Sequence, residues 1–76
     1  MKGTVKNLVA ARNFGFIRGS NNGEYFFHRD DFNGHWDDLV EDLAHQMHPE
    51  VSFDVVESPK GLRAANVRRN DWPNES

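Results

Sequence analysis

Aromatic side chains recur two residues apart in two short segments of this chain. Phe14 and Phe16 flank a glycine, and Phe26 and His28 lie in an aromatic run that begins at Tyr25. Residues two apart in a β-strand point to the same face, so each pair would lie on one side of its strand. Rings displayed side by side on a sheet can stack on the bases of a single-stranded nucleic acid. The chemistry that this spacing indicates is therefore stacking.

The opposite face of the same segments carries Ile17, Tyr25 and Phe27. A chain of 76 residues builds only a small core, so one of the two faces must stay outside. Gly15 shares the face of Ile17, where a small residue allows close backbone approach, and this favours Ile17, Tyr25 and Phe27 as the core. The three phenylalanines and the histidine would then form an exposed patch of the kind that marks an interaction site. Periodicity alone leaves the reverse assignment open.

Basic residues surround the aromatic segments and could neutralise phosphates. The candidates are Lys6, Arg12, Arg29, Lys60 and Arg63. The net charge of −3 argues against a nucleic-acid binder, but residues 30 to 57 hold nine Asp and Glu and no Lys or Arg, while all nine Lys and Arg lie outside that range. If the segments before and after this range fold together, one side of the protein can be basic. The acidic run can then form a separate solvated face that repels phosphate.

Catalytic and metal-binding patterns are weak. His28 has no orienting acid that the sequence identifies, and no nucleophile–base pair can be assembled. His45 and His48 offer two imidazoles three residues apart, too few for a metal site, and the chain has no cysteine. We therefore expect no enzyme activity, no metal and no cofactor.

Turn-forming residues divide the chain into five segments of β character. Strands are predicted at 2–10, 14–18, 24–28, 51–56 and 62–69, with Ala65 and Val67 on one face of the last. The predicted fold class is all-β, because five short strands with one long connection after the third fit a small barrel. Strand alternation does not distinguish an OB-fold barrel from an SH3-like one.

The long connection contains apolar residues at helical spacing, namely Trp36, Leu39, Leu43 and Met47. Asp37 and Asp38 suit a helix N-terminus and Pro49 suits a stop, so a short helix is predicted over 36–46. Trp36 could be a further stacking platform if the loop folds over the aromatic face. The interpretation that we favour is that Trp36 anchors the helix against the end of the barrel.

Four short motifs resemble those of the cold-shock domain family, in the right order and spacing. They are Phe14-Gly15-Phe16-Ile17, similar to the centre of the family's K-G-F-G-F-I; Tyr25-Phe26-Phe27-His28, similar to its V-F-V-H; Lys2-Gly3-Thr4-Val5-Lys6, similar to its opening G-x-V-K; and Pro59-Lys60-Gly61 with Ala64-Ala65-Asn66-Val67, similar to its closing hairpin and strand. The resemblance covers residues 2 to 32 and 50 to 69. It indicates a divergent member of bacterial type with a lengthened loop after the third strand.

The resemblance implies a five-stranded antiparallel OB-fold barrel that binds single-stranded RNA or DNA on the outer face of its first three strands. It also implies a role like that of an RNA chaperone, with little sequence preference. Together with the cations above, the expected nucleic-acid-binding residues are Lys6, Arg12, Phe14, Phe16, Phe26, His28, Arg29, Lys60 and Arg63.

The chain departs from the family's pattern at several of these positions. Asn7-Leu8-Val9 stands where the family has Trp-Phe-Asn, so one large stacking ring is lost. Asn13 replaces the glycine before Phe14, and Arg29 replaces a phenylalanine, which exchanges a ring for a cation that can stack flat on a base or pair with phosphate. These departures bear on affinity more than on fold.

The remaining expectations concern organisation and partners. Residues 1–69 are expected to form one domain and residues 70–76 a disordered tail. We expect a cytoplasmic monomer with no membrane association, because no apolar run approaches the roughly 20 residues of a membrane span. The alternative function is a protein-interaction module that uses the acidic loop and Trp36 as its docking surface.

Overall fold

The computed structural model describes residues 1–70 of the chain, so residues 71–76 of the tail expected at 70–76 lie outside the described residues. Its elements, in chain order, are β1 (Lys2–Val9), η1 (Ala10–Arg12), β2 (Phe14–Gly19), β3 (Glu24–His28), η2 (Arg29–Asp31), α1 (Trp36–Ala44), β4 (Glu50–Ser58) and β5 (Gly61–Arg69). Asn70 remains attached to the sheet, because its N–H donates to the carbonyl of Glu50 at 2.8 Å.

The five predicted strands are all present, and β3 has the predicted bounds. The predicted helix begins at Trp36 as expected but ends at Ala44, two residues early. Gln46 takes a left-handed φ of 62°, and the N–H of Met47 turns back to the carbonyl of Asp42 at 2.8 Å. This pattern is a Schellman-type C-terminus, which stops the helix because it satisfies the last carbonyls.

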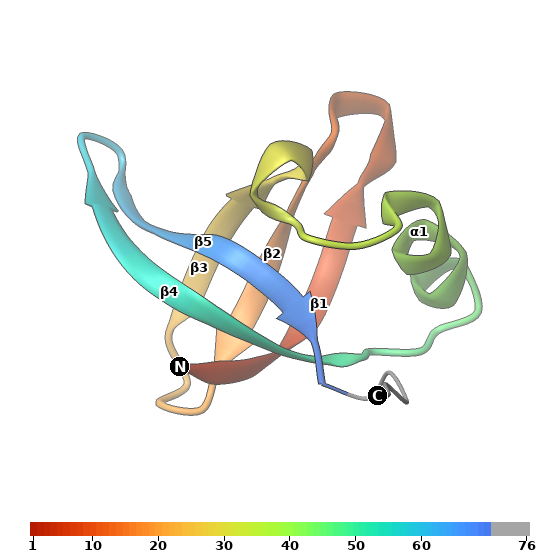
Figure 1. Cartoon of the computed structure of the whole chain (residues 1–76), viewed down its shortest axis with the longest axis horizontal. Coiled ribbons are helices and arrows are strands. Elements are labelled where there is room, and N and C mark those ends of the chain that lie inside the picture. The colour runs from red at the N-terminus through yellow and green to blue at the C-terminus, as the bar shows by residue number, and fades with distance from the viewer. Residues whose placement is uncertain (71–76) are drawn as a thin grey trace.

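The strands form one sheet that closes into a ring in the order β1-β2-β3-β5-β4 (Figure 1). Four pairs are antiparallel, whereas β3 pairs with β5 in parallel through Phe26 and Arg63. The expectation of a wholly antiparallel sheet is wrong at this pair. Strand direction cannot alternate all the way round a ring with an odd number of strands, so one parallel pair is unavoidable.

The interior contains the core set that Gly15 favoured. Ile17 and Phe27 are fully buried and Tyr25 is nearly so. A Cβ on Gly15 would collide with the side chain of Leu8 and lie 2.7 Å from the carbonyl oxygen of Asn7. The strands can therefore approach this closely only with glycine, and the face assignment derived from it is confirmed.

The face assignment within β5 differs from the prediction. Ala64, and not Ala65, is fully buried together with Val67. The register against β4 shifts between Ser52 and Asp54, where Asn66 adopts a left-handed φ of 52°. This bulge adds one residue to β5 and reverses the side-chain alternation upstream of it.

The helix is anchored to the ring by Trp36. The Trp36 ring is 6% exposed and makes edge contacts with Phe27 and Phe32 at centroid distances of 5.8 Å and 6.3 Å. Six residues further along the helix, Asp42 forms an ion pair of 2.7 Å with Arg69 of β5. Trp36 is thus an anchor in this structure, as the favoured interpretation held.

Replacing Trp36 with alanine should lower the free energy of unfolding by about 3–5 kcal/mol, because a buried ring is lost and a cavity remains. Trp36→Phe keeps a ring and should fall between this variant and the parent. Met47→Ala is the control, since Met47 is 55% exposed and should change stability by no more than about 0.5 kcal/mol. Urea unfolding measures all three. An unchanged midpoint for Trp36→Ala would contradict the anchoring role.

Candidate nucleic-acid interface

The outer face of β2 and β3 carries the four predicted stacking residues in two rows. Phe14 pairs with His28 and Phe16 pairs with Phe26 across the β2–β3 ladder. All four are half-buried, whereas the residues between them are buried. Side-chain alternation therefore brings the four residues together on one surface, on the side of the sheet away from the core.

The three phenylalanines of this surface pack against one another. The ring centroid of Phe14 lies 5.8 Å from that of Phe16 and 5.2 Å from that of Phe26, and Phe16 and Phe26 are 6.0 Å apart. Edge-to-face and tilted contacts of this kind hold aromatic rings in defined orientations. The cluster is therefore a preformed apolar platform that still exposes part of each ring.

The turn before this platform preserves a conformation that glycine adopts easily. Asn13 takes a left-handed φ of 61°, and asparagine tolerates that region better than most residues. Its carbonyl accepts the N–H of Arg29 at 2.7 Å, which ties the start of β2 to the end of β3. Asparagine is therefore compatible with the local backbone at this position, where the motif that the sequence resembles has glycine.

His28 is held by the short helix that follows it. Its Nδ1 accepts the N–H of Asp30 at 3.1 Å, and its own N–H donates to the carboxylate of Asp31 at 3.0 Å. A ring nitrogen that accepts carries no proton, so the neutral imidazole carries its proton on Nε2. His28 therefore has an N–H donor left for a ligand.

A groove of about 580 Å³ opens beside Phe16 and Phe26. Its other wall is the tip of the β4–β5 hairpin, with Ser58, Pro59, Lys60, Leu62 and Arg63. The structure thus brings the predicted Lys60 close to the rings. The groove also includes Leu62, which is 47% exposed. The sequence did not predict this residue, because the hairpin lies beside β3 only once the ring of strands has closed.

The five predicted cations divide into two groups according to whether they form an ion pair. Within residues 1–70, Arg12, Arg29 and Lys60 form no ion pair, whereas Lys6 and Arg63 each hold a carboxylate. Arg12 is the exposed last residue of η1, two residues before Phe14. Arg12 therefore lies at one end of the aromatic surface, and Lys60 lies at the groove.

Arg63 serves as a brace between strands. Its guanidinium contacts the carboxylate of Asp31, the same oxygen that accepts the N–H of His28. The contact ties β5 to the end of β3, where the two strands share a single pairing at Phe26. Arg63 therefore lies at the predicted site but is already committed to the fold.

Lys6 is likewise engaged in the described structure. The β1–β2 register shifts between Val5 and Asn7, so Lys6 is the extra residue of a bulge. Its Nζ lies 2.6 Å from a carboxylate oxygen of Glu24 on β3. The hydrogen bond and then the charge of Lys6 lower the pKa of the Glu24 carboxyl below its ordinary value. Desolvation opposes them, and the charge of Arg18 makes the smallest contribution in the lowering direction.

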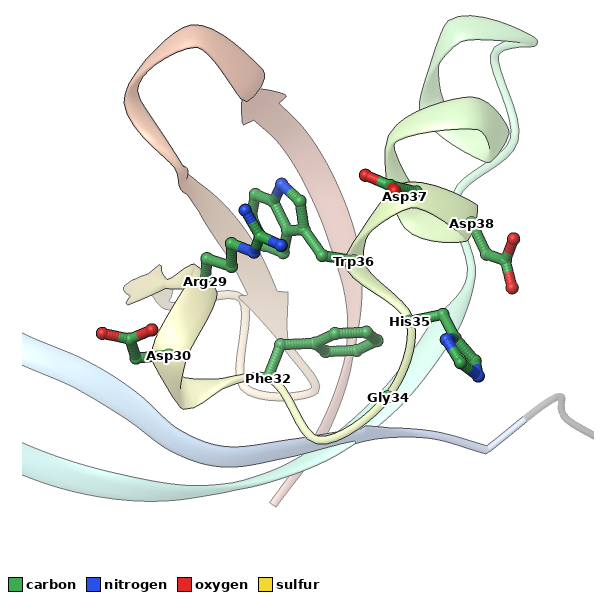
Figure 2. A pocket seen from close by; sticks show the side chains of 8 residues that line it. All are labelled: Arg29, Asp30, Phe32, Gly34, His35, Trp36, Asp37 and Asp38. Carbon is green, nitrogen blue, oxygen red and sulfur yellow. The ribbon is translucent and has the colours of Figure 1, made fainter.

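Arg29 borders a second hollow, of about 650 Å³, between η2 and the start of α1. Figure 2 shows its side chain extending in the direction of the Trp36 indole, while the carboxylate of Asp30 points away. The predicted Arg29 thus lies at the end of β3 outside the phenylalanine cluster. The lining also includes Asp37 and Asp38, so acidic groups predominate there.

Other functional features are limited in the described part of the chain. His48, one of the two imidazoles weighed as a metal pair, is bonded through Nδ1 to the carbonyl of Val5 at 2.9 Å. No group of three or more potential ligands that could hold a metal ion occurs in residues 1–70. Within the same range, no helix has the length and apolarity needed to cross a membrane.

Comparison with known proteins shows what the chain is similar to. The family model described as the 'Cold-shock' DNA-binding domain matches residues 1–70. The chain is also 37% identical over 68 residues to the cold shock protein CspC of Bacillus subtilis (strain 168), an alignment that covers 90% of this chain and 96% of that protein.

The ion pair predicts the titration of Glu24. In the native protein its carboxyl should titrate below the ordinary pKa, and Lys6→Ala should raise the midpoint, as followed by side-chain carboxyl NMR signals. Because the folded-state pKa is the lower one, the pair stabilises the fold above the ordinary value and loses that contribution as the pH falls through the lowered pKa.

Lys2→Ala is the matched control for this titration, because Lys2 is exposed on the same strand and forms no ion pair within residues 1–70. It should leave the midpoint of Glu24 near the parental value. Equal midpoints in the parent and in Lys6→Ala would show that the pair does not persist in solution.

Proposed function

Since this chain belongs to the cold-shock domain family, whose members bind nucleic acid, we propose that it binds single-stranded RNA or DNA by stacking bases on the outer face of β1 to β3. The stacking residues are Phe14, Phe16, Phe26 and His28. The observation that carries the proposal is the cluster of three half-buried phenylalanine rings, with centroids 5.2–6.0 Å apart, on the side of the sheet away from the core.

The groove between the rings and the β4–β5 hairpin extends this face. A base next to the one stacked on Phe26 could contact the exposed side chain of Leu62 on the opposite wall of the groove. Lys60 lines the same groove and can approach the phosphate of that nucleotide. Arg12 and Arg29 supply further cations toward the other end of the platform. We propose that the closed five-stranded ring is a barrel of the OB type, which commonly binds oligonucleotides on such a face.

The phenylalanine rings of the platform support low sequence specificity. Phenylalanine rings stack on any base because every base has a π-face. A protein that holds unpaired strands in this way opposes weak base pairing by mass action. A role like that of an RNA chaperone follows from these two properties.

The alternative of a protein-docking module receives less support. It requires Trp36 to form an exposed apolar patch, yet the ring is 6% exposed and packs on Phe27 and Phe32. The acidic run is also partly engaged within the fold, because Asp31 and Asp42 pair with Arg63 and Arg69.

An amide NMR titration with oligothymidine and with oligouridine at low salt tests the function. Shifts should concentrate on β2, β3 and the groove, at Phe14, Phe16, Phe26 and His28, and leave α1 nearly unchanged. Shifts confined to residues 35–48, or no shifts with either oligonucleotide, would overturn the proposal. The two oligonucleotides also compare DNA with RNA.

Removing one ring should weaken binding without unfolding the protein. Phe16→Ala should raise the Kd for oligothymidine about tenfold or more, since stacking contributes about 1–3 kcal/mol per base. Fluorescence or calorimetric titration measures the change, and the amide spectrum checks the fold.

Leu43→Ala is the matched control for the loss of apolar surface, because Leu43 is also partly buried against the core but lies on α1. It should leave the Kd within about twofold of the parent, as expected for a site remote from the ligand. If Phe16→Ala and Leu43→Ala weaken binding equally, the phenylalanine acts through the fold and stacking is excluded at that position.

A further inference from the structure

A carboxylate lies on the same face as the proposed stacking residues. Glu24, Phe26 and His28 follow one another at intervals of two along β3, so alternation puts all three on the outer side. Burial agrees, because Glu24 is exposed while the intervening Tyr25 and Phe27 are buried. A phosphate chain that follows this face would approach the negative charge of Glu24.

The Glu24 carboxylate is held by one of the predicted phosphate-binding cations. Its oxygen lies 2.6 Å from Nζ of Lys6, and the two side chains are 50% and 46% exposed. β1 pairs with β2 and β2 with β3, so the ion pair spans β2. It therefore crosses the outer face, next to the Phe16–Phe26 row.

We propose that Glu24 is an internal competitor for phosphate at Lys6 and thereby limits the affinity of the face for nucleic acid. The inference rests on the proposed function and names an affinity-determining residue for it. A carboxylate and a phosphate are both anionic oxygen acceptors, and each neutralises the same ammonium group. A bound strand must displace Glu24 from Lys6, or leave Lys6 unused, and it then lies beside an unpaired carboxylate.

The geometry distinguishes Glu24 from the two aspartates at the His28 end of the face. The carboxylate of Asp30 lies 3.7 Å from Nδ1 of His28 and forms no ion pair with Lys or Arg within residues 1–70. Asp31 accepts both Arg63 and the N–H of His28, and its side chain is only 17% exposed, so releasing it would dismantle the end of β3. Within residues 1–70, the carboxylate of Glu24 accepts a side-chain hydrogen bond from Lys6 alone. Exposed ion pairs are weak, so a phosphate can open this one while the fold stays intact.

A double-mutant cycle on the full chain tests the inference, with oligothymidine as the probe and Kd measured over a range of salt. Glu24→Gln removes the charge and keeps the shape, and should tighten binding about two- to fivefold at low salt, the scale of an exposed ion pair. Its affinity should also fall more steeply with salt, by up to about 0.7 log unit per log unit for one further phosphate neutralised.

Lys6 decides between competition and a general charge effect. In the Lys6→Ala background, Glu24→Gln should tighten binding less than it does in the parent, because no ammonium group is released. Glu41→Gln removes the same charge from the exposed surface of α1 and measures the general charge effect in both backgrounds. Conversely, Lys6→Ala should weaken binding more in the Glu24→Gln protein than in the parent.

The outcomes separate the two proposals. If the parent binds and the effects of the two substitutions add independently, or if Glu24→Gln equals Glu41→Gln in both backgrounds, Glu24 is not a competitor and the stacking function stands. If neither the parent nor Glu24→Gln binds oligothymidine or oligouridine, the proposed function fails and the inference fails with it.

Discussion

The close approach of β1 and β2 at Gly15 is the constraint from which the rest of the molecule follows. Leu8 and the carbonyl of Asn7 occupy the space that a Cβ would need, so the register of the two strands is fixed at this point. With that register, Ile17 must point inward, and alternation sends Phe14 and Phe16 outward. The interior and the aromatic surface are thus two consequences of the same steric contact.

The strands and the core of β2 and β3 could be predicted because they depend on local alternation. The parallel pair, the bulge at Asn66 and the groove at Leu62 could not, because each depends on how distant segments meet. Asn66 illustrates the difference: one extra residue in β5 moves Ala64 inward in place of Ala65, yet nothing in the neighbouring sequence requires it. The end of α1 was missed for a similar reason, since glutamine at the left-handed position is a weak stop signal.

The charges follow geometry more closely than sequence order. A long acidic run predicts one solvated face, but Asp31 and Asp42 within it instead brace Arg63 and Arg69 of β5. These two pairs join the ends of β3 and α1 to the last strand, where backbone pairing is sparse. Some of the charged residues that the sequence alone would assign to phosphate binding or phosphate repulsion therefore stabilise the closed ring instead.

The loss of a ring at Asn7 changes where aromatic side chains lie on the outer face. Asn7 pairs with Phe16, so β1 contributes an amide where the family's pattern has an aromatic side chain. The rings of the phenylalanine cluster therefore lie on β2 and β3. On its other side the surface continues through the groove to Leu62 and Lys60 of the β4–β5 hairpin. The apolar surface thus extends toward β5 and away from β1. Lys6 lies on the β1 side in contact with Glu24, so the side that lacks the ring is also the side on which the cation is already neutralised. For the proposed stacking function, both features favour the side of the β4–β5 hairpin.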